Sequence, residues 1–426
     1  MDMHFEKRPF RESRDLLLQK VSRVPAETVP LDEAYGRVVA GDITAGMMIP
    51  HYDRSPYDGY ALRSCDIRGA APENPVTLTV VREIRPGDPA GRGLREGEAA
   101  KILTGAPIPE GADATVKYED TVFSGETVTL SAPLAAGQNI IRAGEDVKKG
   151  DLLAADGTVA DTAVMGLLSS QGLSEIAVYK KLRVAVISTG DELLEAGEEL
   201  SGSKIYNSNR YTLTAELLKN GFAADYLGRA GDDTDGIADL LSRALQDHDA
   251  VILTGGVSAG DYDLVPDAFR KIGAEIVIHG VKMKPGMAGV YGFYQGKPCI
   301  ALSGNPVSAL TGFYCIAAPL LRKYAGMSRY NPEIIRVKIT RDFTKGGQKD
   351  GQKDGQKDGQ KGGQNRMAER ILRGAMSIEN GTVCLTPSRE QGNVVISSLS
   401  GARILAIVPG DHGPVKAGDV LDGFII

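Results

Sequence analysis

The stretch "AVILTGGVSAGDYD" at residues 250–263 decides the fold. Its four apolar residues predict a buried strand. The strand leads directly into two glycines, a serine, a third glycine and two aspartates. Glycines let backbone N–H groups approach an anion, and carboxylates suit a hard cation such as Mg²⁺. This pattern is typical of an α/β sheet, in which ligand loops begin where parallel strands end.

The same alternation of elements extends over residues 182–325. Apolar runs at 182–189, 222–230, 249–256 and 274–281 predict strands, and 207–221, 232–246 and 263–273 have helical spacing. A hairpin at 289–302 and a long helix from Pro306 complete the domain. This order predicts a doubly wound α/β domain with right-handed crossovers.

The rest of the chain predicts a multidomain protein of α/β plus β class. Residues 1–45 with 145–181 predict an N-terminal helical and linker domain in which 144–181 pack on the N-terminal helix. Residues 46–144 predict an all-β domain and 182–328 the α/β domain. Residues 329–426 predict a small C-terminal β-barrel, with strands at 333–340, 382–387, 393–399 and 404–409. The repeat "GQKD" at 347–364 has no apolar residue and predicts a disordered surface loop.

Composition excludes several classes of protein. A net charge of −6 argues against a general nucleic-acid binder. We find no signal peptide at the N-terminus and no apolar run long enough for a membrane span, so we expect a cytoplasmic protein. The four cysteines are scattered and contain no CxxC pair, which argues against a zinc site. No histidine stands beside a serine or cysteine nucleophile, which disfavours a hydrolase triad.

Five loops are expected at one edge of the α/β sheet, at residues 188–193, 229–233, 254–263, 280–289 and 302–308. The first three carry Glu192, Asp232 and Asp263, which predict a Mg²⁺ site. The fourth supplies Lys284 as a point charge. The last starts a helix whose free N–H groups suit a phosphate. Each loop alone could also be an ordinary turn or helix cap.

The β domain carries three further segments of interest. Residues 50–62 contain Asp58 before a glycine and an aromatic residue. Residues 101–120 place Thr104 and a glycine after a strand, and residues 143–151 place Asp146 beside two lysines. Each segment could also be a turn.

Taken together, these motifs resemble one family. The set "SPYDGYA", "TGAPIPEGADATV", "GEDVKKGD", "STGDEL", "NSN", "TGGVSAGDYD", "KPG" and "SGNPVSA" is similar to that of the MoeA family, the molybdopterin molybdenumtransferases related to the gephyrin E domain. The resemblance runs in order from about residue 10 to 425.

The resemblance implies a four-part subunit that works as a homodimer, with an α/β domain similar to MogA-type molybdopterin-binding domains. It implies that adenylylated molybdopterin and molybdate are the substrates and that AMP is released with Mg²⁺. It places the cleft between the α/β part of one subunit and the β part of the other. Implied partners are a molybdopterin adenylyltransferase and molybdoenzyme apoproteins or their chaperones, with no nucleic acid and no membrane.

The resemblance also assigns residue roles. The catalytic residues are Asp58, Glu192, Asp232, Asp263 and Lys284, of which Glu192, Asp232 and Asp263 hold the metal. The cofactor-binding residues are Thr104, Asp146, Gly255, Gly256, Ser258, Ser303, Gly304, Asn305 and Arg370.

Some positions depart from the family pattern. Met287 and Ala288 stand where the family writes lysine and proline, Ser303 stands for proline, Asn393 for serine, and "PYDGYA" for "AMDGYA". The lost ammonium at residue 287 would weaken binding of an oxyanion by about 1.5–3 kcal/mol. Two functions therefore stay open: an active transferase, which could use molybdate or tungstate, and a carrier that holds molybdopterin or the finished cofactor without inserting metal.

Overall fold

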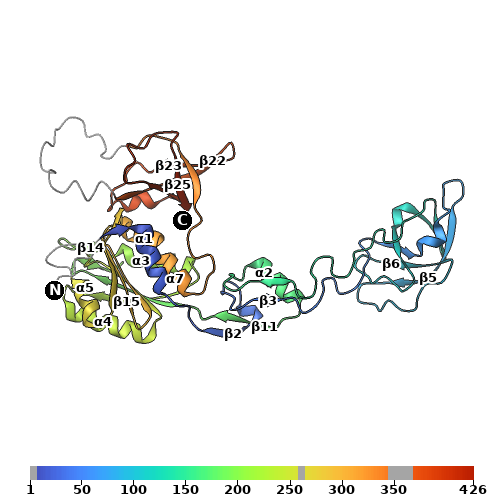
Figure 1. The fold of residues 1–426 in the computed structure, drawn as a ribbon, viewed down its shortest axis with the longest axis horizontal. Coiled ribbons are helices and arrows are strands. Elements are labelled where there is room, and N and C mark those ends of the chain that lie inside the picture. Colours follow the sequence, from blue (N-terminus) through green and yellow to red (C-terminus); the bar gives the residue numbers. More distant parts are fainter. Residues whose placement is uncertain (1–6, 258–263, 344–367) are drawn as a thin grey trace. The chain divides into compact units, whose positions relative to one another are not determined.

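The computed structural model describes residues 7–257, 264–343 and 368–426 (Figure 1). The chain forms two compact units, one of residues 1–41, 156–160 and 175–426, and one of residues 42–155 and 161–174. The repeat at 347–364, and the loop expected there, lie outside the described residues. The boundaries of the four expected domains stay a prediction.

The first unit contains the α/β sheet, whose strands run in the order β15-β12-β16-β20-β19-β17. Four of the strands are parallel neighbours, and β19 runs antiparallel between β20 and β17. The central strand β16 is buried throughout and β12 is buried after its first residue, Arg183, because both faces of the sheet are covered. The strands are β12 (Arg183–Thr189), β15 (Ala223–Ala230), β16 (Ala250–Thr254), β17 (Glu275–His279), β19 (Gly289–Tyr294) and β20 (Lys297–Leu302).

Helices cover both faces of this sheet, which confirms the doubly wound prediction. One hydrophobic core contains Leu213 of α3 and Ile316 of the π-helical segment η4, and a second contains Leu241 of α4 and Phe269 of α5. Figure 1 shows α3 and α7 on the side of the sheet opposite α4 and α5. The helices are α3 (Ser208–Lys219), α4 (Thr234–Asp247), α5 (Leu264–Lys271), α6 (Pro306–Gly312), η4 (Phe313–Ala317) and α7 (Ala318–Tyr324).

The N-terminal helix α1 (Phe10–Lys20) belongs to this α/β packing. Its Phe10 and Leu17 are buried in the same core as Phe313 and Ile316. The expectation that residues 144–181 pack on this helix is therefore wrong, because the apolar stripe of α1 is already covered by η4 and α7. Strand β2 (Ala26–Pro30) pairs instead with β11 (Glu175–Tyr179).

The C-terminal residues form a closed five-stranded barrel, as expected. The pairings run β22-β23-β21-β25-β24 and return to β22. Val337, Leu372, Leu385 and Ile404 fill its interior. The strands are β21 (Ile335–Ile339), β22 (Glu369–Glu379), β23 (Thr382–Pro387), β24 (Ile404–Val408) and β25 (Val420–Ile425).

Two local predictions in this region are wrong. Residues 393–399 are not a strand: they form a loop and the 3₁₀ helix η5 (Ile396–Leu399), in which Val394 and Ile396 are exposed. Residues 281–284 are not a loop: they form β18 (Val281–Lys284), which pairs with β1 (Arg8–Pro9) and with β22. Burial alternates along β18, as it does in a strand with one covered face. The segment "VKMK" is too short for this alternation to be recognised in the sequence.

The second unit is built on a six-stranded sheet in the order β7-β4-β6-β5-β9-β8. Tyr60, Leu78, Val116 and Val128 lie in its core. The all-β prediction is confirmed for this sheet. Its strands are β4 (Gly59–Leu62), β5 (Val76–Ile84), β6 (Glu98–Ile102), β7 (Ala114–Lys117), β8 (Thr121–Ser124) and β9 (Thr127–Leu130), and the unit also contains β3 (Ile43–Thr44), β10 (Leu152–Ala154) and α2 (Thr162–Ser170).

Candidate functional site

The carboxyl ends of the parallel strands form the first part of the candidate site. Strands β15, β12, β16 and β20 are adjacent and run in the same direction, so the loops that follow them begin at one edge of the sheet. Four of the five loops predicted from the sequence are therefore gathered as expected.

Two of these loops touch through small residues. Gly255 has φ of +96°, and a Cβ on it would lie 2.6 Å from the carbonyl oxygen of Thr189. Its amide donates to the carbonyl of Leu302 at 3.1 Å. A Cβ on Gly304 would lie 3.6 Å from the Cα of Gly255. Only glycine fits at residue 255, and Gly256 follows it with another positive φ. Ser258 and Asp263 lie outside the described residues.

Asn209 is a buried polar residue at this edge, and we did not single it out from the sequence. Its side-chain amide donates to the carbonyl of Gly304 at 2.8 Å. Its carbonyl oxygen Oδ1 is buried and has no hydrogen-bond partner among the residues that the structure describes. A buried acceptor without a partner costs about 1–3 kcal/mol, so a bound donor there would be stabilised. The motif "NSN" was the signal that could have identified this residue.

The two described carboxylates predicted to hold metal are Glu192 and Asp232. Both are exposed, and no described lysine or arginine forms an ion pair with either. Among residues 7–257, 264–343 and 368–426, no group of three or more His, Cys, Asp or Glu side chains could hold a metal ion. The Mg²⁺ site stays a prediction, because its third expected ligand, Asp263, is outside the described residues.

A hydrogen-bond network holds the loop that carries Glu192. The carbonyl of Glu192 accepts from the amide of Ile205 at 2.9 Å, in the short pair β13 (Leu193–Leu194) and β14 (Ile205–Tyr206). Glu195 accepts from Arg210 at 2.5 Å and from the Tyr226 hydroxyl at 2.7 Å. Burial alone would raise the pKa of Glu195, but the hydrogen bonds from Tyr226, Arg210 and Asn207 outweigh it and lower that pKa. The carboxylate therefore stays ionised and anchors the loop.

Asn207 joins this network to the sheet. It is buried, caps α3 by accepting from the Arg210 amide at 3.1 Å, and donates to Ser188 Oγ at 3.0 Å. Ser188 lies one residue before the end of β12. The network thus fixes where the chain leaves β12 toward Glu192.

The start of α6 differs from the expectation of free N–H groups. The Val307 amide donates to the carbonyl of Asn393 at 3.1 Å, and the Asn305 amide donates to Ser303 Oγ at 3.2 Å. Residue 306 is a proline and has no N–H. The prediction that this helix start presents its first amides to an anion is therefore wrong for residues 305 and 307. The amide of residue 305 already donates to Ser303, and that of residue 307 donates to a loop of the C-terminal barrel.

Lys284 and Arg370 are brought together by the C-terminal sheet. They are register partners on the parallel strands β18 and β22. Both are partly buried, and Arg370 donates to the Gly413 carbonyl at 3.2 Å. Two cations on neighbouring strands attract an anion more strongly than either alone. The sequence predicted both residues but not that they are neighbours.

Arg373 is a buried arginine near this site that the sequence did not single out. It is only 2% exposed, and burial lowers its pKa to about 10. Its guanidinium donates to neutral oxygens only, among them Ser398 Oγ at 2.8 Å and the carbonyl of Gly392 at 3.0 Å. It therefore holds the loop whose next residue, Asn393, caps α6. Arg373 lies three residues after Arg370 on the same strand, and the sequence gave no sign that one arginine is buried and the other is partly exposed.

The second unit places Asp58 and Thr104 in contact. The Thr104 amide and hydroxyl donate to Asp58 Oδ1 at 2.7 and 2.8 Å. These hydrogen bonds lower the pKa of Asp58. Asp146 is exposed and lies on another segment, where its amide donates to the Ile49 carbonyl at 3.0 Å. The structure thus joins two of the three residues predicted here.

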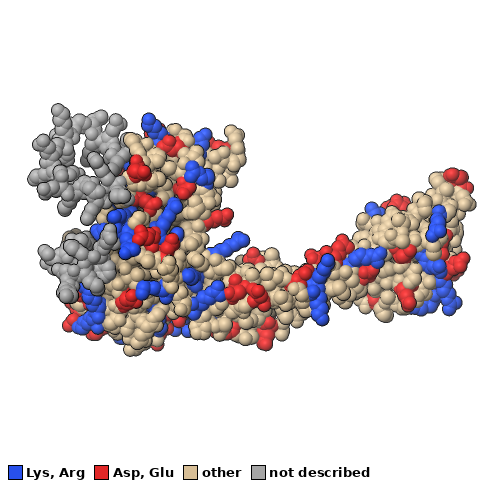
Figure 2. Space-filling view, in the orientation of Figure 1, with Lys and Arg blue, Asp and Glu red and all other residues tan. Residues whose placement is uncertain are grey.

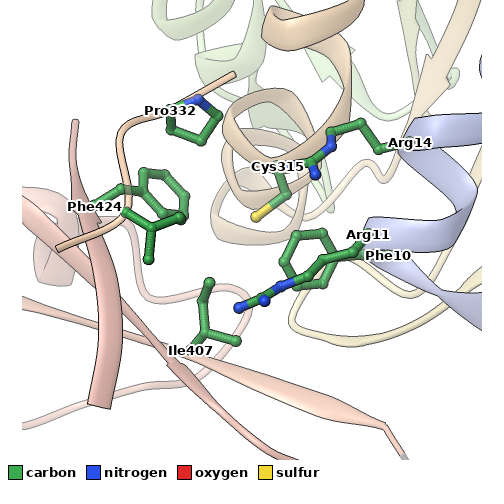
Figure 3. Close-up of a pocket in the computed structure, with 8 residues that line it drawn as sticks. Phe10, Arg11, Arg14, Cys315, Pro332, Ile407 and Phe424 are labelled. Carbon is green, nitrogen blue, oxygen red and sulfur yellow. The ribbon is translucent and has the colours of Figure 1, made fainter. Parts of the chain in front are cut away.

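A cavity of about 70 Å³ lies elsewhere in the first unit, where α1 and η4 meet the C-terminal barrel (Figure 3). Figure 3 shows the side chains of Phe10, Cys315 and Phe424 around it. None of the predicted site residues lines it. The lining residues are Phe10, Arg11, Arg14, Cys315, Pro332, Ile334, Ile407 and Phe424. We therefore place the candidate site at the strand ends and at the Lys284–Arg370 pair.

Charge on the face shown in Figure 2 is mixed, with acidic and basic side chains interspersed. The full sequence carries a net charge of −6. Among the described residues, no helix has both the length and the apolar character to cross a membrane.

Comparisons with known proteins cover nearly the whole chain. Residues 8–172 match the family model described as MoeA N-terminal region (domain I and II), and residues 185–323 match the one described as probable molybdopterin binding domain. The chain is 33% identical to the molybdopterin molybdenumtransferase of Staphylococcus aureus (strain COL) over 414 residues, which are 97% of this chain and 94% of that protein. It is 32% identical to the protein of the same name from Staphylococcus epidermidis (strain ATCC 12228 / FDA PCI 1200) over 412 residues, with the same coverage.

A solved structure agrees with this similarity. The molybdopterin biosynthesis moeA protein of Pyrococcus horikoshii OT3 matches with a TM-score of 0.81 and 29% identity, over 99% of this chain and 100% of that one. The molybdenum cofactor biosynthesis protein of Pyrococcus furiosus matches with a TM-score of 0.57 at 19% identity over 99% of this chain and 100% of that one, which supports the fold alone.

Proposed function

Because this chain belongs to the MoeA family of molybdopterin molybdenumtransferases, enzymes of molybdenum cofactor biosynthesis, we propose that it takes adenylylated molybdopterin and molybdate and releases AMP. The observation that carries this proposal is the strand-end edge. There, the Gly255 amide donates to the Leu302 carbonyl at the end of β20, and Asn209 offers a buried acceptor that no described residue satisfies. An edge of this kind suits a flat, hydrogen-bonding ligand that carries phosphates.

Two of the three predicted metal ligands support the proposal of a hard divalent cation. Glu192 and Asp232 follow adjacent strands, and both offer carboxylate oxygens that no described cation neutralises. Oxygen ligands of this kind suit Mg²⁺. We propose that these two residues, with Asp263, hold Mg²⁺, which would polarise the phosphoanhydride as a Lewis acid.

The remaining groups bind and orient the substrates. We propose that Lys284 and Arg370 hold the oxyanion, because their strands place them side by side. The network around Glu195 keeps Glu192 at the sheet edge. Positioning and electrostatic stabilisation of this kind supply most of the rate in phosphoryl transfer.

The oligomeric state, partners and location are also proposals. The family resemblance supports a homodimer in the cytoplasm that receives its substrate from a molybdopterin adenylyltransferase and passes product to molybdoenzyme apoproteins or their chaperones. We propose that the β unit of each subunit, through Asp58, Thr104 and Asp146, completes the site of the other. Mixing inactive Asp58→Asn and Asp232→Asn proteins then restores part of the activity, because one site in the mixed dimer is intact. Activity no greater than that of the unmixed variants would contradict this arrangement.

The proposed function is tested by AMP release. Purified protein receives adenylylated molybdopterin and Mg²⁺ and is titrated with molybdate and, separately, with tungstate. Oxyanion-dependent AMP release is expected, and the more effective oxyanion identifies the metal. The Asp232→Asn variant should bind the pterin and release little AMP. Tight pterin binding by the parent protein with no AMP release under any oxyanion would establish the carrier function instead.

A further inference from the structure

Tyr57 lies at the edge of the second unit where Asp58 and Thr104 meet. Strand β4 begins at Gly59 and runs antiparallel to both β6 and β7. Gly59 pairs with Ile102, the last residue of β6, and with Lys117, the last residue of β7. The residues before β4 and those after β6 and β7 are therefore gathered at one end of the sheet.

The backbone of Tyr57 is held while its ring is exposed. Ser55 is buried, and its Oγ donates to the Tyr57 carbonyl at 2.6 Å and accepts from the Tyr57 amide at 3.3 Å. The residue is 37% exposed, whereas Tyr60, three positions later, is 2% exposed. A tyrosine has only two side-chain torsions to restrict, so an exposed ring on a fixed backbone binds a flat ligand at a low entropic cost.

Lys117 completes this arrangement. Its ammonium lies 4.4 Å from the centroid of the Tyr57 ring. Lys101 on the neighbouring strand is paired with Glu83 at 2.8 Å, but in the described part of the chain no carboxylate forms such a pair with Lys117. One cation therefore lies against the ring and has no acidic partner among the described residues. Such a cation can meet the phosphate of a ligand whose flat part stacks on the ring.

We propose that Tyr57 and Lys117 form a stacking platform for a bicyclic nitrogen heterocycle that carries a phosphate, next to Asp58. In the proposed reaction this chemistry belongs to both the pterin and the adenine of the substrate, so the inference rests on the proposed function and extends it. The chain itself points to this role, because Tyr57 stands where "AMDGYA" has methionine. A methionine offers no ring face to a heterocycle.

A single exposed tyrosine by itself needs no ligand to explain it. Tyr35 is such a residue, 68% exposed, in the first unit. Tyr57 differs because it adjoins the Asp58–Thr104 hydrogen bonds and carries a lysine that no described carboxylate pairs with. Tyr35 is therefore the matched control.

The chain contains no tryptophan, which makes the platform directly measurable. The Tyr57→Trp variant carries one indole at the proposed platform, and the Tyr35→Trp variant carries one at the control position. Each is titrated with AMP and, separately, with molybdopterin that is not adenylylated, in the presence of Mg²⁺. We expect saturable quenching of emission in the Tyr57→Trp variant alone. The ligand that quenches identifies whether the adenine or the pterin stacks.

Dissociation constants measured by equilibrium dialysis give a second readout on the full-length chain. Tyr57→Ala is expected to weaken binding of the stacking ligand about 5- to 150-fold, the range that loss of one ring–base stack produces. Tyr57→Phe keeps the ring and should bind like the parent protein. Lys117→Met keeps the aliphatic stem and should weaken the same ligand, because only the charge is lost.

The result that overturns the proposal is the absence of quenching by both ligands in the Tyr57→Trp variant together with unchanged binding by Tyr57→Ala. If the parent protein still releases AMP on addition of molybdate, that result refutes the platform and leaves the proposed function standing. If the parent releases no AMP but the quenching and the loss in Tyr57→Ala are observed, the platform holds and the proposed reaction fails.

Discussion

Replacing Arg373 with methionine is expected to lower the free energy of unfolding of the C-terminal barrel by about 2 kcal/mol, at the low end of the cost of two unpartnered carbonyls. The guanidinium is buried and makes five hydrogen bonds, to Ser398 Oγ, to Gln391 Oε1, and to the backbone carbonyls of residues 390, 391 and 392. Methionine fills a similar volume but donates nothing, so the carbonyls of residues 390 and 391 lose their partner among the described residues, while the carbonyl of Gly392 still accepts from the Val395 amide at 3.4 Å.

The magnitude follows from these contacts. An unpartnered buried carbonyl costs about 1–3 kcal/mol, which gives about 2–6 kcal/mol for two. The low end applies because residue 390 is exposed and residue 391 is half-exposed, so water can replace part of the hydrogen bonding that is lost. Removing the buried charge itself offsets some of the cost. With a urea m-value of about 1–3 kcal/mol/M, the midpoint of the unfolding transition shifts by about 0.7–2 M.

The assay combines urea unfolding with amide hydrogen exchange of residues 388–399. Exchange there should accelerate in Arg373→Met, and so should exchange of the Val307 amide, because its acceptor is the carbonyl of Asn393. Arg370→Met is the matched control: it lies on the same strand and makes one hydrogen bond, to the Gly413 carbonyl. It should change stability by less than about 1 kcal/mol while raising the molybdate concentration needed for AMP release. An Arg373→Met protein as stable as the parent, with unchanged exchange, would refute the reasoning.

Three further predictions concern charge. Thr104→Val removes one of the hydrogen bonds that lower the pKa of Asp58, so an NMR titration should find that pKa raised and the acid limb of AMP release should move to higher pH. Thr104→Ser keeps the hydroxyl and should leave the pKa and the acid limb unchanged. An unchanged pKa of Asp58 in Thr104→Val would contradict the assignment. Burial raises the pKa of Glu369, whose Oε2 is buried and has no hydrogen-bond partner among the described residues. The cost of burying its charge is therefore absent below its unfolded pKa near 4.5 and grows as pH rises. Glu369→Gln should raise the free energy of unfolding by about 1 kcal/mol at pH 8 and not at pH 4, and a variant as stable as the parent protein at both pH values would count against this reasoning. Met287→Lys should lower the molybdate concentration needed for AMP release about 10- to 150-fold, because it adds an ammonium that can bind the oxyanion. The fold should tolerate the change, since the carbonyl of residue 287 accepts from the Val281 amide at 2.9 Å whatever the side chain is. An unchanged molybdate requirement would mean that the oxyanion is held elsewhere.

The local sequence was sufficient for the layered α/β domain and for its ligand edge. Continuous apolar runs such as 182–189 and helical spacing in 207–221 are set by short-range periodicity, which the folded chain keeps as β12 and α3. Because parallel strands end at the same edge, the order of strands along the chain is enough to place the loops at 190, 231, 255 and 303 together. The barrel and the β unit followed from alternating strands in the same way, although the strand at 393–399 did not form.

Only the tertiary structure decided how distant segments meet. Residues 281–284 leave the α/β domain and pair with β22, which makes Lys284 the neighbour of Arg370; no local pattern carries that register. Arg370 and Arg373 are three residues apart on one strand, and an odd separation places their side chains on opposite faces. One face leaves Arg370 half-exposed, and the other buries Arg373 beneath the loop that caps α6. The sequence does not say which face of this strand is buried. The packing of the barrel decides it, and leaves Arg370 at the surface while Arg373 holds a loop.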